Sequence, residues 1–199
     1  MRPFLLLALA ASLTPLLPAA ELLWPGLLGP QRDGWAEHFE VPARWPKQLK
    51  KDWSVEVGTG YGTPLVAGQR VYQHARQGEE EVVWCFDLAS GKRIWRKSYP
   101  APFKIGGGGD KHGKGPKSCP VVADGRLFTL SITGVIHGWD AENGSLLWRK
   151  DYKEKWAKGN QPYWGVSTSP IVDGGRLIVH LGNDDEGALY AFDVRSGEE

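Results

Sequence analysis

The stretch of the sequence with the most suggestive chemistry is residues 108–114, which read G-G-D-K-H-G-K. This spacing, G-x-x-x-x-G-K, matches the loop that cradles the phosphates of nucleotides. Such a loop is followed by a Ser or Thr that binds magnesium and by a helix whose N-terminus faces the phosphate. Here Gly115 and Pro116 follow, and the next segment is typical of a β-strand. We therefore interpret the stretch as a glycine-rich connection between strands and not as a phosphate site.

The titratable residues show no pattern typical of a metal site or a catalytic centre. The histidines lack spacings such as H-x-x-x-H that bind zinc, and we expect them in the core or at its rim. The acidic run at residues 79–81 favours a solvated turn between two strands. No G-x-S-x-G motif is present, and no pair of carboxylates can be assigned to one site. The sequence therefore predicts no metal site and leaves any catalytic or cofactor-binding residue unknown. The five histidines are His38, His74, His112, His137 and His180.

Two long segments combine lysines with aromatic residues. Residues 99–118 contain four lysines among six glycines, and residues 152–168 contain three lysines, two Trp and two Tyr. A basic, aromatic surface of this kind suits a small acidic or sugar-like ligand, or a protein partner. The alternative is that the lysines are solvated and the aromatic residues pack on the base of the loops. The candidate ligand face consists of Lys111, His112, Lys114, Trp156, Tyr163 and Trp164.

A repeated pattern supplies the elements that would position these segments. Each copy has an Asp, a Gly four residues later and, where the sequence reaches that far, a Trp eight residues later. The Asp carboxylate can accept hydrogen bonds from the N–H groups of a turn, and Asn143 with Gly144 supplies the positive-φ positions of that turn. The Trp then anchors the returning strand. The repeated residues are Asp87, Gly91, Trp95, Asp140, Gly144, Trp148, Asp193 and Gly197.

Short strands at hairpin spacing predict an all-β fold, a β-propeller of four-stranded antiparallel blades. Repeats at about residues 61–99, 118–152 and 166–199 form a partial propeller of about three blades within residues 53–199. Because a ring takes about four to eight blades, we expect the protein to continue past residue 199, with Trp at position 201. Both basic segments connect one blade to the next, so both should emerge on the same face.

The N-terminal part of the sequence differs from the repeats. Residues 1–20, with an early Arg2 and a short apolar run, predict a secretory signal peptide, since the run is too short for a membrane anchor. Residues 21–52 read as a Pro-, Gly- and Trp-rich arm that lies across the domain, with its Trp residues docked in grooves. Residues 51–55 resemble the last strand of a repeat, so this segment could complete a blade begun by the C-terminus. We expect a periplasmic or secreted protein without a transmembrane segment. The Trp residues of the arm are Trp24, Trp35 and Trp45.

Composition excludes some partners. With 24 basic and 23 acidic residues, the chain has no bulk charge to drive binding to nucleic acid or to an anionic membrane. The two cysteines, Cys85 and Cys119, fall on a third strand and just before the first strand of the next unit. Their Cα atoms should lie beyond the roughly 7 Å limit for a disulfide, so we expect two free thiols.

The repeat resembles the A-x-D-x-x-T-G-x-x-x-W motif of the pyrroloquinoline-quinone-like (PQQ-like) β-propeller repeat family, with Ser90, Asn143 and Ser196 at the Thr position. Residues 24–34 are also similar to the W-P-x-F-R-G-P-x-R-D-G opening of secreted bacterial members, from which Leu27 and Leu28 depart. In that family the Trp docks between neighbouring blades. A WD repeat is a distant alternative, because the recurrent Trp follows the Asp by eight residues.

The resemblance implies two functional classes. Quinoprotein dehydrogenases bind the quinone PQQ, usually with calcium, at the propeller axis, and other members are non-enzymatic scaffolds such as the outer-membrane assembly lipoprotein. The dehydrogenases carry two adjacent cysteines beside the quinone, whereas Cys85 and Cys119 are well separated here. We therefore expect a non-enzymatic binding or scaffolding module with no evident cofactor. Part of a PQQ-dependent dehydrogenase is the alternative.

Overall fold

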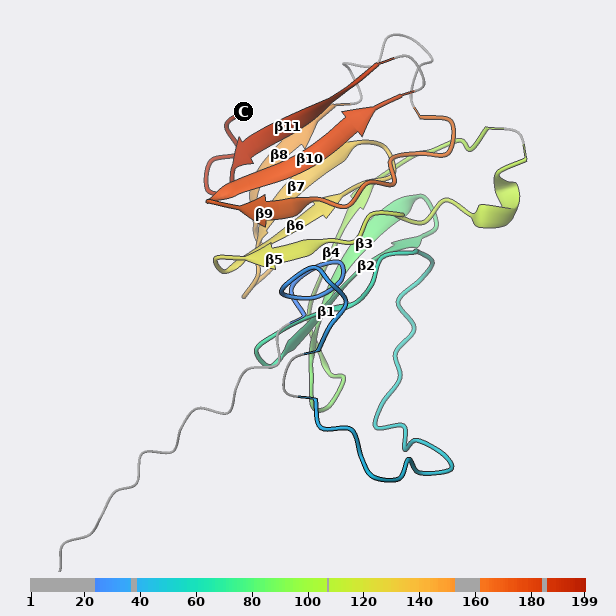
Figure 1. Cartoon of the computed structure of the whole chain (residues 1–199). Helices are drawn as coiled ribbons and strands as arrows, with labels where there is room; N and C mark the ends of the chain where they lie inside the picture. The colour runs from blue at the N-terminus through green and yellow to red at the C-terminus, as the bar shows by residue number, and fades with distance from the viewer. Residues whose placement is uncertain (1–23, 37–38, 107, 153–161, 184–185) are drawn as a thin grey trace, which may run out of the picture.

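The computed structural model describes residues 24–36, 39–106, 108–152, 162–183 and 186–199, so the expected leader at residues 1–20 lies outside the described residues. Within these residues, strands β1 to β11 form three antiparallel sheets (Figure 1). Among the described residues, the sole helical element is the short 3-10 turn η1 at Asp110–His112. The predicted all-β fold of four-stranded antiparallel blades is confirmed.

The strands follow the repeat units. The first sheet contains β1 (Leu65–Ala67), β2 (Arg70–Gln77), β3 (Glu80–Asp87) and β4 (Arg93–Pro100). The second contains β5 (Val121–Ala123), β6 (Arg126–Leu130), β7 (Val135–Asp140) and β8 (Leu146–Asp151). The third contains β9 (Ile171–Asp173), β10 (Arg176–Gly182) and β11 (Gly187–Asp193). In each sheet the strands are neighbours in chain order, which is the topology of a propeller blade.

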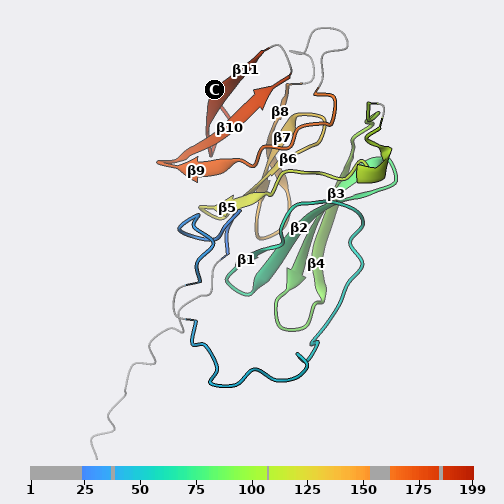
Figure 2. The same cartoon turned by 45° about the vertical axis from the view of Figure 1, so that its right-hand side comes forward.

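The three sheets stack face to face and approach one another along one set of edge strands. Strand β1 contacts β5, and β5 contacts β9, so the sheets converge at these edges (Figure 2). We call β1, β5 and β9 the convergent edge. In a propeller the first strand of each blade lies nearest the axis, so the convergent edge is the axial side of these blades.

Apolar side chains fill the spaces between the sheets. Between the first two sheets, Leu65 and Leu127 are fully buried beside Trp95 and Trp139. Between the second and third sheets, Trp148 packs with Phe128 and neighbouring apolar residues. The middle sheet is covered on both faces, which explains why β7 is buried along nearly its whole length, whereas β11 leaves most of its side chains exposed.

The repeated Asp closes each turn as its chemistry predicts. Asp140 Oδ1 accepts hydrogen bonds from the backbone N–H groups of Glu142 (2.8 Å) and Asn143 (2.9 Å). Gly144 has the positive φ of 73° that the turn needs. The expectation of a second positive-φ position at Asn143 is wrong. Its side-chain Oδ1 instead accepts the N–H of Ser145 at 2.7 Å, which stabilises the turn without a left-handed backbone.

A bulge directs each repeated Trp into the space between sheets. The β3–β4 and β7–β8 registers shift one step before Trp95 and Trp148, which leaves Ile94 and Leu147 as the extra, partly exposed residues. The Trp95 indole N–H then donates to the carbonyl of Ala141 at 3.3 Å, and that of Trp148 donates to the carbonyl of Val194, just after β11, at 3.1 Å. Each indole thus contacts the Asp-Gly turn of the following sheet.

The segment before the first sheet differs in part from its prediction. Residues 51–55 form no strand, yet the Trp53 indole N–H donates to the carbonyl of Leu88 at 2.9 Å, as Trp95 does one sheet later. Of the three Trp residues in the arm, Trp24 is half-buried, whereas Trp35 and Trp45 are 72% and 57% exposed, so the expectation that all three dock in grooves is wrong. Nothing in the sequence around them distinguishes the Trp that has a groove to fill.

Candidate functional site

The connection from β4 to β5 is held in place by its base. Phe103 and Ile105 are buried against Ile132 at the β6–β7 turn. The N–H of Ala101 donates to the carbonyl of Glu79 at 3.0 Å, so the start of the connection is tied to the β2–β3 hairpin. The exposed, glycine-rich part with η1 therefore projects from a fixed base.

Three segments distant in the sequence meet beside η1. The Tyr61 hydroxyl donates to the carbonyl of His112 at 2.6 Å. The His112 ring lies 5.0 Å from the Trp164 ring, and the Trp164 ring lies 6.1 Å from that of Tyr163. The N–H of Gly106 donates to the Tyr163 carbonyl at 3.2 Å, which joins the two connections directly. His112, Tyr163 and Trp164 of the candidate ligand face are thus neighbours in space.

A lysine lies between two of these rings. Lys117 Nζ is 5.5 Å from the centroid of Trp164 and 5.9 Å from that of Tyr61, both within cation–π range. The three aromatic side chains remain open to solvent, with exposed fractions of 56% for Tyr61, 47% for Tyr163 and 44% for Trp164. We call the cluster of Tyr61, His112, Lys117, Tyr163 and Trp164 the loop face.

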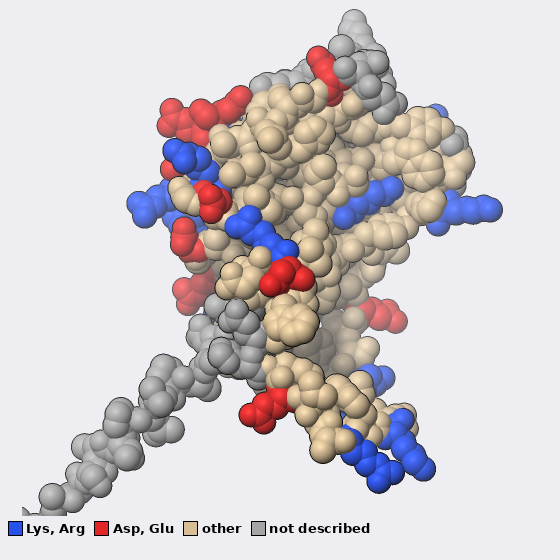
Figure 3. All heavy atoms as spheres, in the orientation of Figure 1, with Lys and Arg blue, Asp and Glu red and all other residues tan. Residues whose placement is uncertain are grey.

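The candidate set and the loop face do not coincide. Lys111 is exposed on η1, and Lys114 is engaged by Glu79, with Nζ and Oε1 3.4 Å apart. Trp156 lies outside the described residues. Sequence reasoning missed Tyr61, although, like Trp164, it shortly precedes the first strand of a sheet. In Figure 3 Lys and Arg atoms flank a tan surface on the side that bears η1.

A second polar cluster is buried between the first two sheets. Glu81 Oε2 lies 3.2 Å from His74 Nε2 and accepts the Tyr99 hydroxyl at 2.7 Å, while Oε1 accepts the N–H of Ile132 at 3.0 Å. The centroid of the His137 ring lies 4.2 Å from that of the Tyr99 ring, with the two rings tilted by 39°. Glu81 and His74 are both fully buried. The expectation of a solvated turn is therefore wrong for Glu81, because β3 already begins at Glu80 and turns that side chain toward the next sheet.

Burial and hydrogen bonding decide the protonation of this cluster. Burial alone would raise the pKa of Glu81, but the hydrogen bond from His74, the charge of His74 and the hydrogen bonds from Tyr99 and Ile132 outweigh it and lower that pKa below 4.5. Burial, and then the charge of Glu81, raises the pKa of Tyr99 well above 10. Burial, followed by the charge of Arg149, lowers the pKa of His137 to about 3. A charged Glu81 beside a neutral Tyr99 and His137 joins the two sheets by hydrogen bonds.

Three of the other histidines lie on strands of different sheets, His74 on β2, His137 on β7 and His180 on β10, and His38 is outside the described residues. Among the residues that the structure describes, no three His, Cys, Asp or Glu side chains gather to hold a metal ion. Cys85 and Cys119 are buried, free thiols. The described residues include no helix long and apolar enough to cross a membrane.

Comparison with known proteins gives two kinds of relative. A family model described as outer membrane protein assembly factor BamB matches residues 79–199. BamB of Bordetella pertussis is 28% identical over 153 residues, covering 75% of this chain and 32% of that protein. The dehydrogenase subunit of alcohol dehydrogenase (quinone) from Gluconacetobacter polyoxogenes is 27% identical over 159 residues, covering 75% of this chain and 21% of that protein. The chain thus spans a third or less of the length of these relatives.

A solved structure supports the fold. The crystal structure of quinohemoprotein alcohol dehydrogenase from Comamonas testosteroni superimposes with a TM-score of 0.60 and 21% identity. The match covers 90% of this chain and 27% of that protein. At 21% identity this match shows similarity in the fold alone.

Proposed function

The chain belongs to the family described as outer membrane protein assembly factor BamB, and on this premise we propose that it is a non-enzymatic binding or scaffolding module of a periplasmic or secreted protein. Residues 1–20 would direct export. The contacts of Trp53, Trp95 and Trp148 with the following sheets would act as the blade-docking contacts of the PQQ-like repeat. The propeller is then a rigid support that presents its connecting loops to a ligand.

The observation that carries this proposal is the position of Lys117 between the exposed rings of Tyr61 and Trp164. A rigid cluster of aromatic rings with a cation offers stacking and charge pairing at a low entropic cost, because Tyr and Trp side chains have few rotatable bonds. The exposed ammonium of Lys111 adds a second positive charge on the same connection. The loop face therefore suits a ligand that carries carboxylates along an extended chain.

Two sources could supply that chemistry, an acidic protein segment or an acidic sugar chain. Isothermal titration of the protein with a hexaglutamate peptide, with hexagalacturonate and with neutral maltohexaose separates them. We expect binding to one of the acidic probes, weakened by added salt because exposed charges are screened. Equal binding of the neutral sugar would favour stacking alone and contradict the charge-pairing proposal.

The double variant Lys117→Ala/Trp164→Ala tests whether binding occurs at the loop face. Trp45→Ala/Lys50→Ala is the matched control, because Trp45 is 57% exposed and the Lys50 side chain is 90% exposed on the arm. We expect at least a tenfold loss of affinity in the first variant and no change in the control. Unchanged affinity in both would show that the ligand binds elsewhere.

A quinone-dependent dehydrogenase is the second candidate, favoured by the relative named alcohol dehydrogenase (quinone). The test is reduction of an electron-accepting dye by the intact protein with an alcohol, with and without added PQQ and calcium. Dye reduction that requires both additions would replace the scaffold proposal with this one.

A further inference from the structure

The N-terminal arm runs along the convergent edge of all three sheets. Trp24 forms a backbone bridge with Val66 in β1, with N–O distances of 2.7 and 3.0 Å. The Pro25 carbonyl accepts the N–H of Val122 in β5 at 2.7 Å. The Arg32 guanidinium donates to the carbonyl of Val172 in β9 at 3.3 Å. Each of these strands is an edge strand, so the arm satisfies backbone groups that no other strand of its own sheet can reach.

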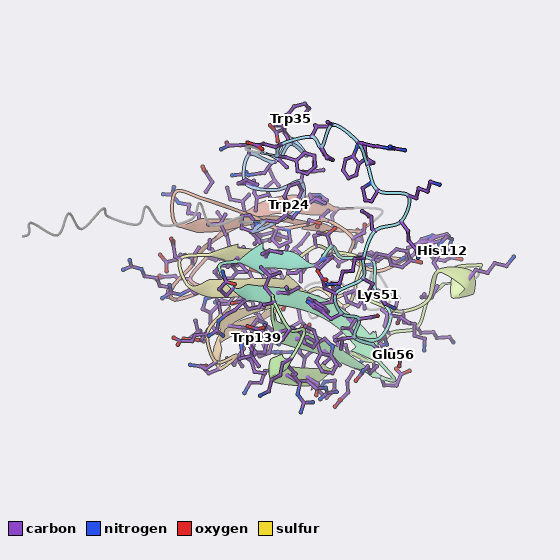
Figure 4. The ribbon with its side chains drawn as sticks, turned by 90° about the horizontal axis from the view of Figure 1, so that it is seen from below. Trp24, Trp35, Lys51, Glu56, His112 and Trp139 are labelled. Carbon is purple, nitrogen blue, oxygen red and sulfur yellow. The ribbon has the colours of Figure 1, made fainter. Side chains whose placement is uncertain are left out.

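The shape of the arm fits this edge closely. A Cβ built on Gly26 would lie 3.4 Å from Cγ2 of Val121, and one built on Gly29 would lie 2.9 Å from the Trp24 ring. The arm turns back on itself through Leu28, whose φ is 64°, and the N–H of Gly34 donates to the Leu28 carbonyl at 2.9 Å. A non-glycine residue holds such a backbone only where surrounding contacts require it. Figure 4 shows Trp24 against the sheets and Trp35 farther out along the arm.

We propose that residues 24–34 are a built-in plug, which occupies the axial edge of these blades in place of a ligand. Pro25 and Leu27 of the plug and Val121, Ile171 and Val172 of the strands line the groove between them. The surface is therefore largely apolar.

The lining does not fit the quinone of the related dehydrogenases. PQQ carries three carboxylates, and burying them requires several cations or hydrogen-bond donors. Among the described residues of the groove, Arg32 supplies the charge, and its guanidinium already donates to the Val172 carbonyl. The backbone N–H groups of Val66 and Val122 are likewise used by the plug. The axial edge of these blades thus binds the chain's own N-terminal segment and not a tricarboxylate.

An engineered disulfide tests the position of the plug. A Cβ on Gly26 lies 3.9 Å from the Val121 Cβ, within the range of about 3.5–4.5 Å found in disulfides. Gly26→Cys/Val121→Cys should therefore form a bridge in nearly all molecules on mild oxidation, assigned by peptide mass mapping. The control pair is Gly26→Cys/Gly125→Cys, because a Cβ at Gly125 has no heavy atom within 4 Å. It should remain reduced.

The outcomes separate cleanly when both variants keep the β-sheet circular dichroism of the parent protein. A bridge in the first pair alone supports the plug. No bridge in the first pair, or equal bridging in both, overturns it.

The oxidised, bridged variant then tests the exclusion of the quinone. Equilibrium dialysis against PQQ and calcium ions measures binding without any need for activity. No saturable binding by the bridged protein, or binding by the reduced form that disappears on oxidation, supports exclusion. Saturable binding by the bridged protein overturns it. Neither result depends on the loop face, so the two proposals fail independently.

Discussion

The indole of Trp95 in the first sheet lies directly against Gly144 in the turn of the second, so that a Cβ on Gly144 would come within 2.8 Å of indole Cδ2. The same relationship holds between Trp148 and Gly197, at 2.7 Å, and between Trp53 and Gly91, at 2.6 Å. Two constraints therefore require glycine at the fourth position after the Asp: the backbone has a positive φ, and the indole of the neighbouring segment occupies the space of a side chain. The repeat encodes contacts between sheets as well as turns.

The Gly144→Ala substitution tests both constraints, the positive φ and the close approach of the indole. Gly144 has a φ of 73°, and Gly125 in the same sheet has a φ of 70° with nothing within 4 Å of its Cβ. The Gly125→Ala control measures the backbone cost alone, about 1–2 kcal/mol. Gly144→Ala should lose roughly 1–3 kcal/mol more in urea unfolding, because the methyl group overpacks against Trp95. Equal losses in the two variants would mean that the ring contact does not constrain the turn.

Trp148→Ala should lower the free energy of unfolding by about 3–5 kcal/mol, as large aromatic truncations in cores do. The neighbouring Leu147, which is 44% exposed at the bulge, is the matched control and should change stability by less than about 1 kcal/mol when replaced by Ala. Denaturant melts that coincide for Trp148→Ala and Leu147→Ala would refute the anchoring role.

Trp53→Ala tests whether the segment before the first sheet contributes to the blade although it forms no strand. The Trp53 indole packs on Gly91, and its N–H donates a hydrogen bond to the carbonyl of Leu88. We therefore expect the free energy of unfolding to fall by roughly 2–4 kcal/mol. Trp35→Ala, at a Trp that is 72% exposed, should leave stability within about 0.5 kcal/mol of the parent. Thermal unfolding followed by circular dichroism measures both, and similar midpoints would argue against a structural role for residues 51–55.

Glu81→Gln should destabilise the protein by roughly 3–5 kcal/mol near neutral pH, because it removes the carboxylate from the buried pair of Glu81 and His74. The folded-state pKa of Glu81 is lowered, so its carboxylate stabilises the fold above its unfolded pKa near 4.5 and ceases to do so as pH falls through the folded value. The stability gap between parent and variant should therefore narrow below about pH 4.5. The exposed neighbour Glu80, changed to Gln, should show no such gap. A gap that is constant from pH 7 to pH 3 would contradict this assignment.

His137→Asn tests the buried histidine. The pKa of His137 is lowered to about 3 in the folded state. As pH falls below 6.5, this imidazole therefore becomes protonated in the unfolded chain while it stays neutral in the folded chain. Stability due to the neutral ring is present above pH 6.5 and is lost as pH falls toward 3. The parent should lose stability relative to the variant by up to about 1.4 kcal/mol per pH unit in this window. Parallel stability curves for the two proteins between pH 6.5 and 4 would show that His137 accepts a proton in the folded state.

Local structure in this protein can be predicted from the order of its residues. The turns closed by Asp87, Asp140 and Asp193, and the strands on either side of them, depend on contacts within a few residues, so the spacing of four from Asp to Gly is enough to predict them. The Trp eight residues after the Asp recurs with them in the sequence, but its contacts lie in the following sheet. The three sheets follow because each turn repeats the same hydrogen bonds. The family resemblance rests on these same positions.

Contacts between residues distant in the sequence become visible only in the folded protein. Tyr61 reaches His112 across 51 residues, and Arg32 reaches Val172 across 140, and no periodicity records such pairs. Glu81 has the charge of a surface residue, and only the stacking of the first sheet on the second buries it against Ile132. The loop face and the plug arise in the same way, because the order of the sheets around the convergent edge brings together segments whose local sequences are independent of one another.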